Sequence, residues 1–325
     1  MDLRLLGRTG LAVTPIGLGL ATIGRPAYIT SGRADDLGAD RDVDALRRRS
    51  HDLLDAAYAA GIRYVDAARS YGLAESFLGT WLAARGPAVA DLTVGSKWGY
   101  RYVGEWRLDA SVHEIKDHSA AALDAQIAES RAILGPRLAL YQVHSATLDS
   151  GVLDNAAVLR RLIGLQADGI AVGLTVSGPA QAATIRWALE VRVDDVNPFG
   201  VVQATWNVLE PSAGPALAEA AAAGWGVIVK EALANGRLAT VGEAPPAVAR
   251  LARRHGVTPD ALAIAAALAQ PWATVVLSGA ATLAQLAANV RAVDVALDAE
   301  GVEELAASAE QADAYWAARS TRAWA

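Results

Sequence analysis

The chain has 325 residues, of which 53% are hydrophobic and 20% are charged, with a net charge of −6 and no cysteine. This apolar content excludes a disordered chain, and the lack of cysteine excludes disulfides, thiolate metal sites and cysteine nucleophiles. The mildly acidic balance disfavours nucleic acid and anionic membranes as main partners, because both bind basic surfaces.

Two uncharged stretches resemble targeting or membrane segments. Residues 11–24 follow two arginines as a secretory signal would, but a proline and three glycines make them a poor apolar helix. Residues 261–290 are long enough to span a bilayer, yet Gln270-Pro271 and Ser278-Gly279 divide them into helix, strand and turn. We therefore expect a soluble, cytoplasmic protein without a membrane partner.

Short apolar runs alternate with helical patterns along the whole chain. The expected strands are 16–20, 62–67, 92–97, 138–144, 170–176, 201–206, 227–230 and 274–278, and helical spacing is clearest over 50–60, 120–134, 156–166 and 215–223. About eight such units predict an α/β protein of the closed (β/α)8 TIM barrel type, with 1–325 as one domain. An open doubly wound sheet is the alternative, but no GxGxxG motif follows a strand.

Two segments interrupt this repeat. Residues 24–49 mix glycine, proline, serine and charge, and residues 98–118 are polar and aromatic. Each follows an expected strand, so we predict long loops over the C-terminal mouth of the barrel, where barrel enzymes place their sites.

Four chemically capable side chains follow the first strands of this pattern. Asp66, Lys97 and His144 stand at or near the ends of three successive strands, and Tyr71 comes just after the first of these. Any one of them could be a helix cap or a half-buried core residue. Together they predict a site, because a barrel enzyme draws its functional groups from several strand ends.

Several segments resemble signature motifs of the aldo-keto reductase superfamily: GIRYVDAARSYGLAES at 61–76, SKWGY at 96–100, LYQVH at 140–144, VQATWN at 202–207 and SGAATLAQLAANV at 278–290. The opening LRLLGRTGLAVTPIGLG resembles the N-terminal hairpin and first strand of that family. The resemblance implies a barrel that binds a nicotinamide nucleotide without a Rossmann domain. It also implies a catalytic set of Asp66, Tyr71, Lys97 and His144.

Carbonyl reduction explains these residue types. The carbonyl oxygen gains negative charge and needs a proton, which Tyr71 would donate. A free tyrosine has a pKa of about 10, and we expect the cation of Lys97 to lower it. Asp66 would hold Lys97, and His144 would orient the carbonyl or relay the proton.

The resemblance also implies nucleotide contacts. Gln203 matches the residue that binds the nicotinamide carboxamide, whereas Thr175-Val176 replaces the usual Ser-Asn pair. Further contacts are expected from Leu233, Gly236, Arg237, Gly279, Gln285 and Asn289. The family favours NADP(H), but Ala280-Ala281 lacks the usual cation for the 2′-phosphate, so Arg237 or Arg291 would have to supply it and NAD(H) stays possible.

Lys230 is the largest departure from the family pattern, because it occupies the position of an aromatic residue that stacks on the nicotinamide. A cation there would disfavour the oxidised, positively charged cofactor. Pairing of Lys230 with Glu231 is the alternative, although adjacent strand residues point to opposite faces.

The substrate pocket is expected among the residues after Lys97. Trp98, Tyr100, Trp106 and His113 are the candidates, and Tyr315, Trp316 and Trp324 either cover the mouth or pack beneath it. His113 and His118 lack a third ligand at metal-site spacing, so no metal is expected.

The sequence thus predicts an NAD(P)(H)-dependent oxidoreductase that interconverts a small-molecule carbonyl and an alcohol. A nicotinamide-nucleotide-binding regulatory or scaffolding protein with little turnover is the main alternative. A metal-dependent barrel hydrolase using Asp66 and His144 is a third, disfavoured by Lys97 and by the lack of a His-x-His pair.

Overall fold

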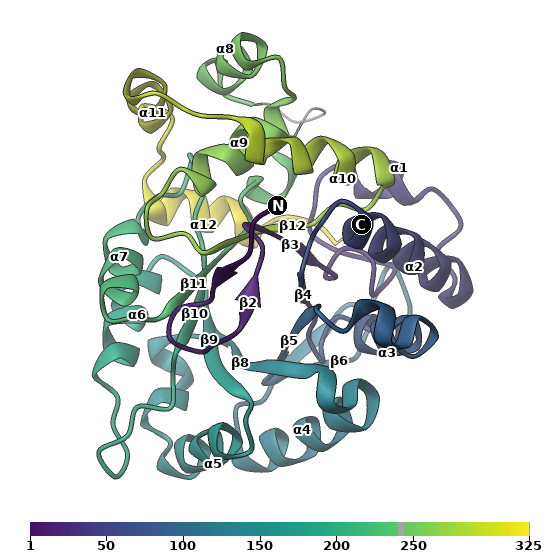
Figure 1. Cartoon of the computed structure of the whole chain (residues 1–325), viewed down its shortest axis with the longest axis vertical. Helices are drawn as coiled ribbons and strands as arrows, with labels where there is room; N and C mark the ends of the chain where they lie inside the picture. The colour runs from purple at the N-terminus through teal and green to yellow at the C-terminus, as the bar shows by residue number, and fades with distance from the viewer. Residues whose placement is uncertain (240–243, 325) are drawn as a thin grey trace.

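Eight parallel strands close into a barrel in the computed structural model, which describes residues 1–239 and 244–324 (Figure 1). They are β3 (Ile16–Gly19), β4 (Tyr64–Asp66), β5 (Thr93–Trp98), β8 (Leu138–Ala146), β9 (Ala171–Val176), β10 (Val201–Thr205), β11 (Gly226–Lys230) and β12 (Val275–Ser278). The strands follow one another around the barrel in chain order, and β12 pairs with β3 to close it. The predicted TIM barrel is confirmed.

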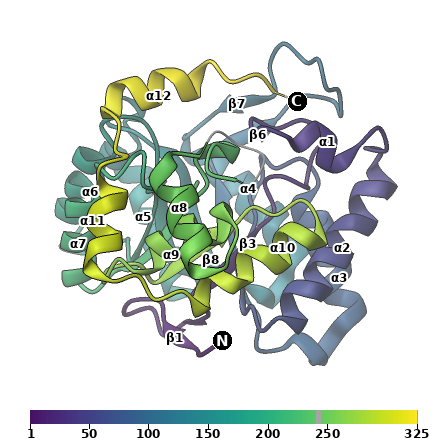
Figure 2. The same cartoon turned by 90° about the horizontal axis from the view of Figure 1, so that it is seen from above.

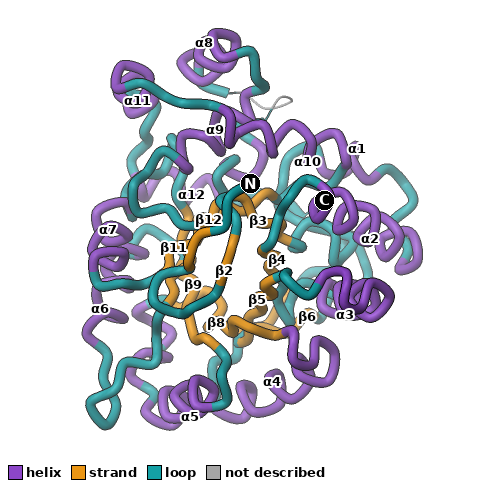
Figure 3. Tube along the Cα trace, in the orientation of Figure 1, coloured by secondary structure: helices purple, strands orange, loops and turns teal. Residues whose placement is uncertain are grey.

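Helices surround the strands, as Figure 3 shows in purple around orange. The barrel helices are α2 (Val43–Ala59), α3 (Ala74–Arg85), α4 (Ala120–Leu134), α5 (Ala156–Ala167), α6 (Gln181–Glu190), α7 (Gly214–Ala222), α9 (Pro259–Leu268) and α10 (Leu283–Val290). Four more lie outside this repeat: α1 (Arg33–Leu37), α8 (Pro246–His255), α11 (Ala299–Ala306) and α12 (Ala312–Ser320).

The predicted irregular segments are partly regular. Residues 24–49 contain α1 and the start of α2, because the Asp42 side chain accepts a hydrogen bond from the Ala45 N–H (2.7 Å) and caps the helix well before residue 50. Residues 98–118 contain an antiparallel hairpin of β6 (Tyr100–Tyr102) and β7 (Glu114–Lys116). The charged residues at the start of α2 obscured its helical pattern in the sequence. The long connection between β6 and β7 obscured the pairing of these two strands.

The N-terminal end of the barrel is filled with apolar side chains. A hairpin of β1 (Arg4–Leu5) and β2 (Ala12–Val13) lies there, opposite α12 in Figure 2. Leu6 and Val13 pack with Tyr64 and with inward residues of the strands, all fully buried. Tyr64 fits because position 95 is glycine: a Cβ there would lie 2.5 Å from the Tyr64 hydroxyl oxygen.

The C-terminal mouth carries α1, the β6–β7 hairpin and α12, which lie at the same end of the molecule in Figure 2. Tyr315 and Trp316 of α12 are buried in a cluster with Leu251, Leu262 and Leu305 from α8, α9 and α11. Two of the three C-terminal aromatic residues therefore pack beneath the mouth, and they anchor α12 there.

The uncharged stretch 261–290 divides as predicted into most of α9, a turn, β12 and α10. Among the described residues, no helix has both the length and the apolar character needed to cross a membrane.

Candidate active site

A cavity of about 430 Å³ lies at the C-terminal ends of the barrel strands. One group of lining residues comes from β4, β8, β10 and β11: Asp66, His144, Gln203 and Lys230. Another follows β12: Gly279, Ala280, Ala281, Gln285 and Asn289. The cavity therefore joins the predicted catalytic residues to the predicted nucleotide contacts.

Asp66 is the hub of the catalytic group. One carboxylate oxygen pairs with Lys97 Nζ, and the other accepts hydrogen bonds from the Tyr64 hydroxyl (3.1 Å) and from Gln203 Nε2 (3.0 Å). Lys97 also donates to the Ala67 carbonyl (2.9 Å). Asp66 and Lys97 are each 1% exposed, so the pair is fixed in position and shielded from water.

Tyr71 lies between this ion pair and His144. Lys97 Nζ is 4.8 Å from the centre of the Tyr71 ring, and the Tyr71 and His144 rings meet edge to face at 5.4 Å. His144 Nδ1 is 3.3 Å from the Ser70 hydroxyl oxygen, which orients the imidazole. The structure thus brings Asp66, Tyr71, Lys97 and His144 together.

The protonation states differ in part from expectation. Burial and then the charge of Asp66 raise the pKa of Tyr71 well above its ordinary value. The pKa of Tyr71 is thus raised rather than lowered as expected from Lys97, because burial and the charge of Asp66 outweigh the lowering effect of a nearby cation such as Arg25. Burial, followed by Lys97, depresses the pKa of His144 well below its usual range. Tyr71 is therefore a neutral phenol and His144 a neutral imidazole near pH 7.

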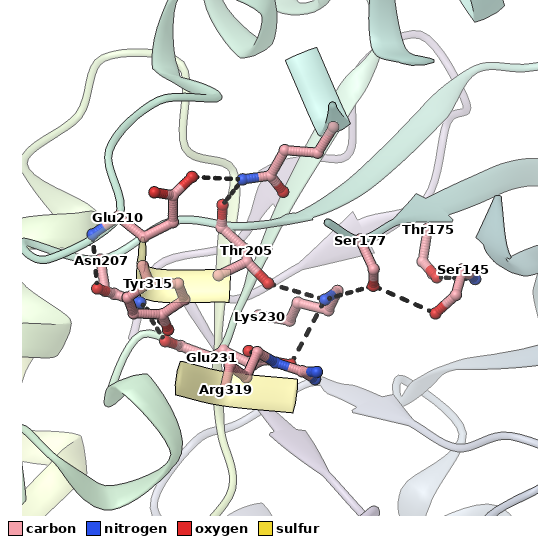
Figure 4. A network of polar contacts seen from close by, with 11 residues as sticks. Ser145, Thr175, Ser177, Thr205, Asn207, Glu210, Lys230, Glu231, Tyr315 and Arg319 are labelled. Carbon is pink, nitrogen blue, oxygen red and sulfur yellow. Dashed lines mark hydrogen bonds and ion pairs between the residues drawn. The ribbon is translucent and has the colours of Figure 1, made fainter. Parts of the chain in front are cut away.

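Lys230 ends β11 and lines the cavity. Figure 4 shows its amino group between Thr205, Ser177 and Glu231. Its Nζ donates to the Thr205 hydroxyl (2.8 Å) and the Ser177 hydroxyl (3.3 Å), and it lies 3.6 Å from Glu231 Oε1. Glu231 adopts a left-handed φ of 54°, which breaks the alternation of the strand. For this reason both adjacent side chains face the same way, and the pairing considered as the alternative is present.

Arg319 of α12 completes this cluster through two hydrogen bonds to the Glu231 carboxylate, one of them 2.8 Å from Nε to Oε2. Burial would raise the pKa of Glu231, but Lys230 and Arg319 outweigh it and lower the pKa to about 2. Burial lowers the pKa of Lys230 to about 8, against the opposing effect of Glu231. The cluster therefore contains two cations around one carboxylate below that pH.

Thr175 does not line the cavity. Its hydroxyl accepts a hydrogen bond from the Ser145 N–H (2.7 Å), and it is fully buried. Ser177, two residues later, lines the cavity instead, beside the Ser145 hydroxyl (3.3 Å). The polar side chain that lines the cavity here is thus Ser177, just after β9, and not Thr175 within that strand.

The loop after β11 and the start of α10 line the rest of the cavity. Leu233 and Gly236 lie in its wall, as do Gly279, Gln285 and Asn289. Arg237 does not line it: its Nη1 binds Glu310 Oε2 (3.1 Å), and its guanidinium lies 5.8 Å from the Tyr315 ring. Arg291 is exposed and does not line it either. Neither arginine suggested for the 2′-phosphate borders the cavity.

Of the four candidate substrate residues, only Tyr100 lines the cavity, 5.1 Å from the His144 ring. Trp98 is fully buried against His118, and the indole N–H of Trp106 donates to the Arg41 carbonyl (2.9 Å) away from the cavity. His113 stacks at 4.3 Å on Trp324, which itself lines the cavity.

Arg25 is 1% exposed in the cavity wall and is not among the residues expected there from the sequence. Its Nη1 donates to Glu114 Oε1 (2.6 Å) and to the Ser70 carbonyl (2.8 Å). Its guanidinium carbon lies 5.4 Å from the Tyr71 ring and 4.6 Å from the Trp324 ring. No motif marks this arginine, because its partners come from distant parts of the chain.

The chain is similar to known proteins over most of its length. A profile of the Aldo/keto reductase family matches residues 15–310. A solved chain from Pseudomonas aeruginosa assigned to the aldo-keto reductases is 27% identical with a TM-score of 0.66, over 90% of this chain and 94% of that one. An aldo-keto reductase from Bacillus halodurans shares the fold, with 22% identity and a TM-score of 0.71 over 96% and 97% of the two chains.

A curated relative, pyridoxal 4-dehydrogenase from Microbacterium luteolum, is 32% identical in an alignment 159 residues long that covers 43% of this chain. The chain matches only 42% of the length of that relative. The family match, in contrast, begins just before the first barrel strand and ends just before α12. The chain therefore belongs to the aldo/keto reductase family.

Proposed function

We propose that this chain is an NAD(P)(H)-dependent oxidoreductase that interconverts a carbonyl and an alcohol, with Tyr71 as the general acid and base. The observation that carries the proposal is the meeting of Tyr71, His144 and the Asp66–Lys97 pair in the cavity that also reaches Gln285 and Asn289. The family membership supports a nicotinamide cofactor.

The lining residues fit such a nucleotide. Gln203 gives its amide N–H to Asp66, which leaves its carbonyl oxygen to accept a hydrogen bond from a carboxamide. Asn235 Oδ1 is buried in the cavity wall and has no hydrogen-bond partner among the described residues, so a ligand donor would satisfy it. Ser31 and Gly236 add a hydroxyl and backbone at the same place.

The catalytic residues then have separable roles. A bound nicotinamide supplies hydride to a carbonyl carbon or accepts it from an alcohol carbon. Tyr71, kept protonated by burial, donates its phenolic proton to the carbonyl oxygen during reduction and takes it back during oxidation. Lys97 stabilises the phenolate that forms, and Asp66 holds Lys97. Neutral His144 offers one ring N–H to orient the oxygen.

The substrate end of the cavity is polar and aromatic. Buried Arg25 and half-buried Glu114 form an ion pair there, beside Tyr28, Tyr100 and Trp324. Charged groups that face a cavity select ligands able to exchange hydrogen bonds with them. We infer a small aldehyde, ketone or alcohol that carries further hydroxyl groups. The relative named as a pyridoxal dehydrogenase supports this class, because pyridoxal is a hydroxylated aromatic aldehyde.

Titration of the intrinsic fluorescence from nine tryptophans tests the proposal with NADH and NADPH separately. We expect saturable binding of at least one nucleotide, and turnover with a panel of hydroxylated aldehydes or the matching alcohols. Binding without turnover would favour the regulatory or scaffolding alternative. Absence of binding at millimolar concentration of either nucleotide would refute the oxidoreductase function.

A further inference from the structure

We propose that Asp36 makes this cavity select a nucleotide with a free ribose 2′-hydroxyl, so that the protein binds NAD(H) in preference to NADP(H). The inference rests on the proposed nucleotide site and specifies its ligand. It comes from a contact across the cavity between α1 and α10, two helices that are far apart in the chain.

Asp36 reaches the predicted adenosine contacts directly. Gln285 Nε2 donates to Asp36 Oδ2 at 2.7 Å, and both residues line the cavity together with Ala280 and Ala281. Gln285 is held in place by two hydrogen bonds. Its side-chain Oε1 accepts from the Ala281 N–H (2.9 Å), and its backbone N–H donates to the Thr282 hydroxyl (3.2 Å). The fixed side-chain amide of Gln285 therefore holds the Asp36 carboxylate at the end of the cavity that β12 and α10 form.

A second carboxylate lies at the same end. Asp260 of α9 is 4% exposed and lines the cavity. With its amide oriented to satisfy both ends, Asn289 donates to Asp260 Oδ2 (2.9 Å) and accepts from the Ser278 hydroxyl (2.9 Å). Gln285 and Asn289, one turn apart on α10, thus each bind an acidic side chain, so two carboxylates lie at this end of the cavity.

Negative charge at this place discriminates between the two nucleotides. A carboxylate accepts a hydrogen bond from a ribose hydroxyl, as acidic residues do in NAD-specific proteins of other folds. A phosphate monoester carries about −1.5 to −2 charges near neutral pH, so a nearby carboxylate repels it. At a partly buried site this repulsion amounts to a factor of about ten or more in affinity.

The arginines that border the cavity are engaged elsewhere. Arg33 donates to the carbonyls of Thr22 (2.7 Å) and Pro26 (2.7 Å), and Arg322 donates to the carbonyls of Ile29 (3.3 Å) and Asn235 (3.0 Å). The contacts of Arg322 tie the segment before α1 to the loop after β11 and leave this cation beside the Asn235 part of the cavity. The guanidinium of Arg33 is directed to backbone carbonyls between residues 22 and 26.

Two further arginines, Arg48 and Arg49 of α2, line a separate hollow next to Ala281. Asp40 and Asp52 line the same hollow, so acidic groups offset the cations there. Arg49 donates to the backbone carbonyl of Asp36 (2.7 Å). This contact fixes α1 against α2 and so positions the Asp36 side chain.

The test measures dissociation constants for NADH and NADPH by tryptophan fluorescence at fixed ionic strength. We expect NADH to bind the unmodified protein about tenfold or more tightly than NADPH. Asp36→Asn should narrow this ratio several-fold, mainly by strengthening NADPH binding. Asp35→Asn is the matched control, because it removes the same charge from the same helix. Asp35 is exposed and does not line the cavity.

A second readout needs no variant. Added salt screens the repulsion, so the NADH preference of the unmodified protein should shrink as ionic strength rises. Tighter binding of NADPH, or equal effects of the two substitutions, would overturn the inference and leave the oxidoreductase function standing. Binding of neither nucleotide would overturn both.

Discussion

The two ends of the barrel interior are built from the same strands but have opposite chemistry. At the N-terminal end, Leu6, Val13 and Tyr64 form a fully buried apolar plug. At the C-terminal end, two residues after Tyr64 on the same strand, Asp66 begins a chain of buried charges. Tyr64 joins the two regions, because its ring packs in the plug and its hydroxyl binds Asp66.

This difference separates stability from function. The plug removes apolar surface from water, and nothing there needs a ligand. The mouth buries paired charges, which contribute little net stability but hold reactive groups in fixed positions. Changes in the two regions should therefore have different signatures, and each of the following experiments tests that contrast.

The largest effect is expected at Tyr71. Replacement of Tyr71 by Phe removes the proton donor and keeps the ring contact with His144. Turnover should fall by about 10²- to 10⁴-fold, with nucleotide affinity nearly unchanged. Steady-state kinetics and nucleotide titration measure the two quantities. Tyr58→Phe is a control remote from the cavity, and survival of turnover in Tyr71→Phe would exclude Tyr71 as the acid.

Asp66→Asn should lower the free energy of unfolding far more than the same substitution at a surface ion pair. The substitution keeps the shape but leaves the Lys97 ammonium buried without its carboxylate, which costs about 3–5 kcal/mol of unfolding free energy. Asp55→Asn is the comparison, because Asp55 pairs with Arg85 at the surface, where a pair contributes about 0–1 kcal/mol. Denaturant unfolding measures both. Equal losses of unfolding free energy in the two variants would show that burial adds nothing to the cost of breaking the Asp66–Lys97 pair.

The plug should influence stability alone. Leu6→Ala removes a fully buried side chain and is expected to cost about 2–5 kcal/mol of unfolding free energy. Leu5→Ala, the adjacent position, is 63% exposed and should cost little. Nucleotide affinity of both variants should match that of the unmodified protein. A large change in affinity for Leu6→Ala would mean that the plug also positions the mouth.

The same contrast explains what could be predicted from the sequence. The barrel strands are largely apolar runs, and each expected strand lies within two residues of its observed bounds. The convergence of Asp66, Tyr71, Lys97 and His144 follows from their places at or near the ends of neighbouring strands. Arg25 gives no such signal, because it enters the cavity from a loop and its partners Ser70 and Glu114 are distant in the chain.

Local backbone geometry sets another limit. The alternation of strand residues places Lys230 and Glu231 on opposite faces, and only the positive φ of Glu231 brings them together. A glutamate, unlike a glycine or an asparagine, gives no indication in the sequence that its backbone is left-handed. The contact of Arg319 with Glu231 likewise could not be predicted from the sequence, because it depends on where α12 packs.

The smallest effect is expected at Lys230. Burial lowers its pKa to about 8, so it is charged below that pH and neutral above it. We propose that the charged form disfavours the oxidised nicotinamide, with Arg319 adding to this effect and Glu231 opposing it. The affinity for oxidised relative to reduced nucleotide should therefore rise a few-fold as pH increases through 8.

Nucleotide titrations between pH 6.5 and about 9.5 measure this ratio, a window that brackets the shifted lysine pKa. Lys230→Met should abolish the step and give a ratio close to the high-pH value of the unmodified protein at every pH. Lys116→Met removes an exposed lysine of β7 and should retain the step. A step that persists in Lys230→Met would assign the pH dependence to another group, and a flat ratio in the unmodified protein would show that Glu231 already neutralises the cation.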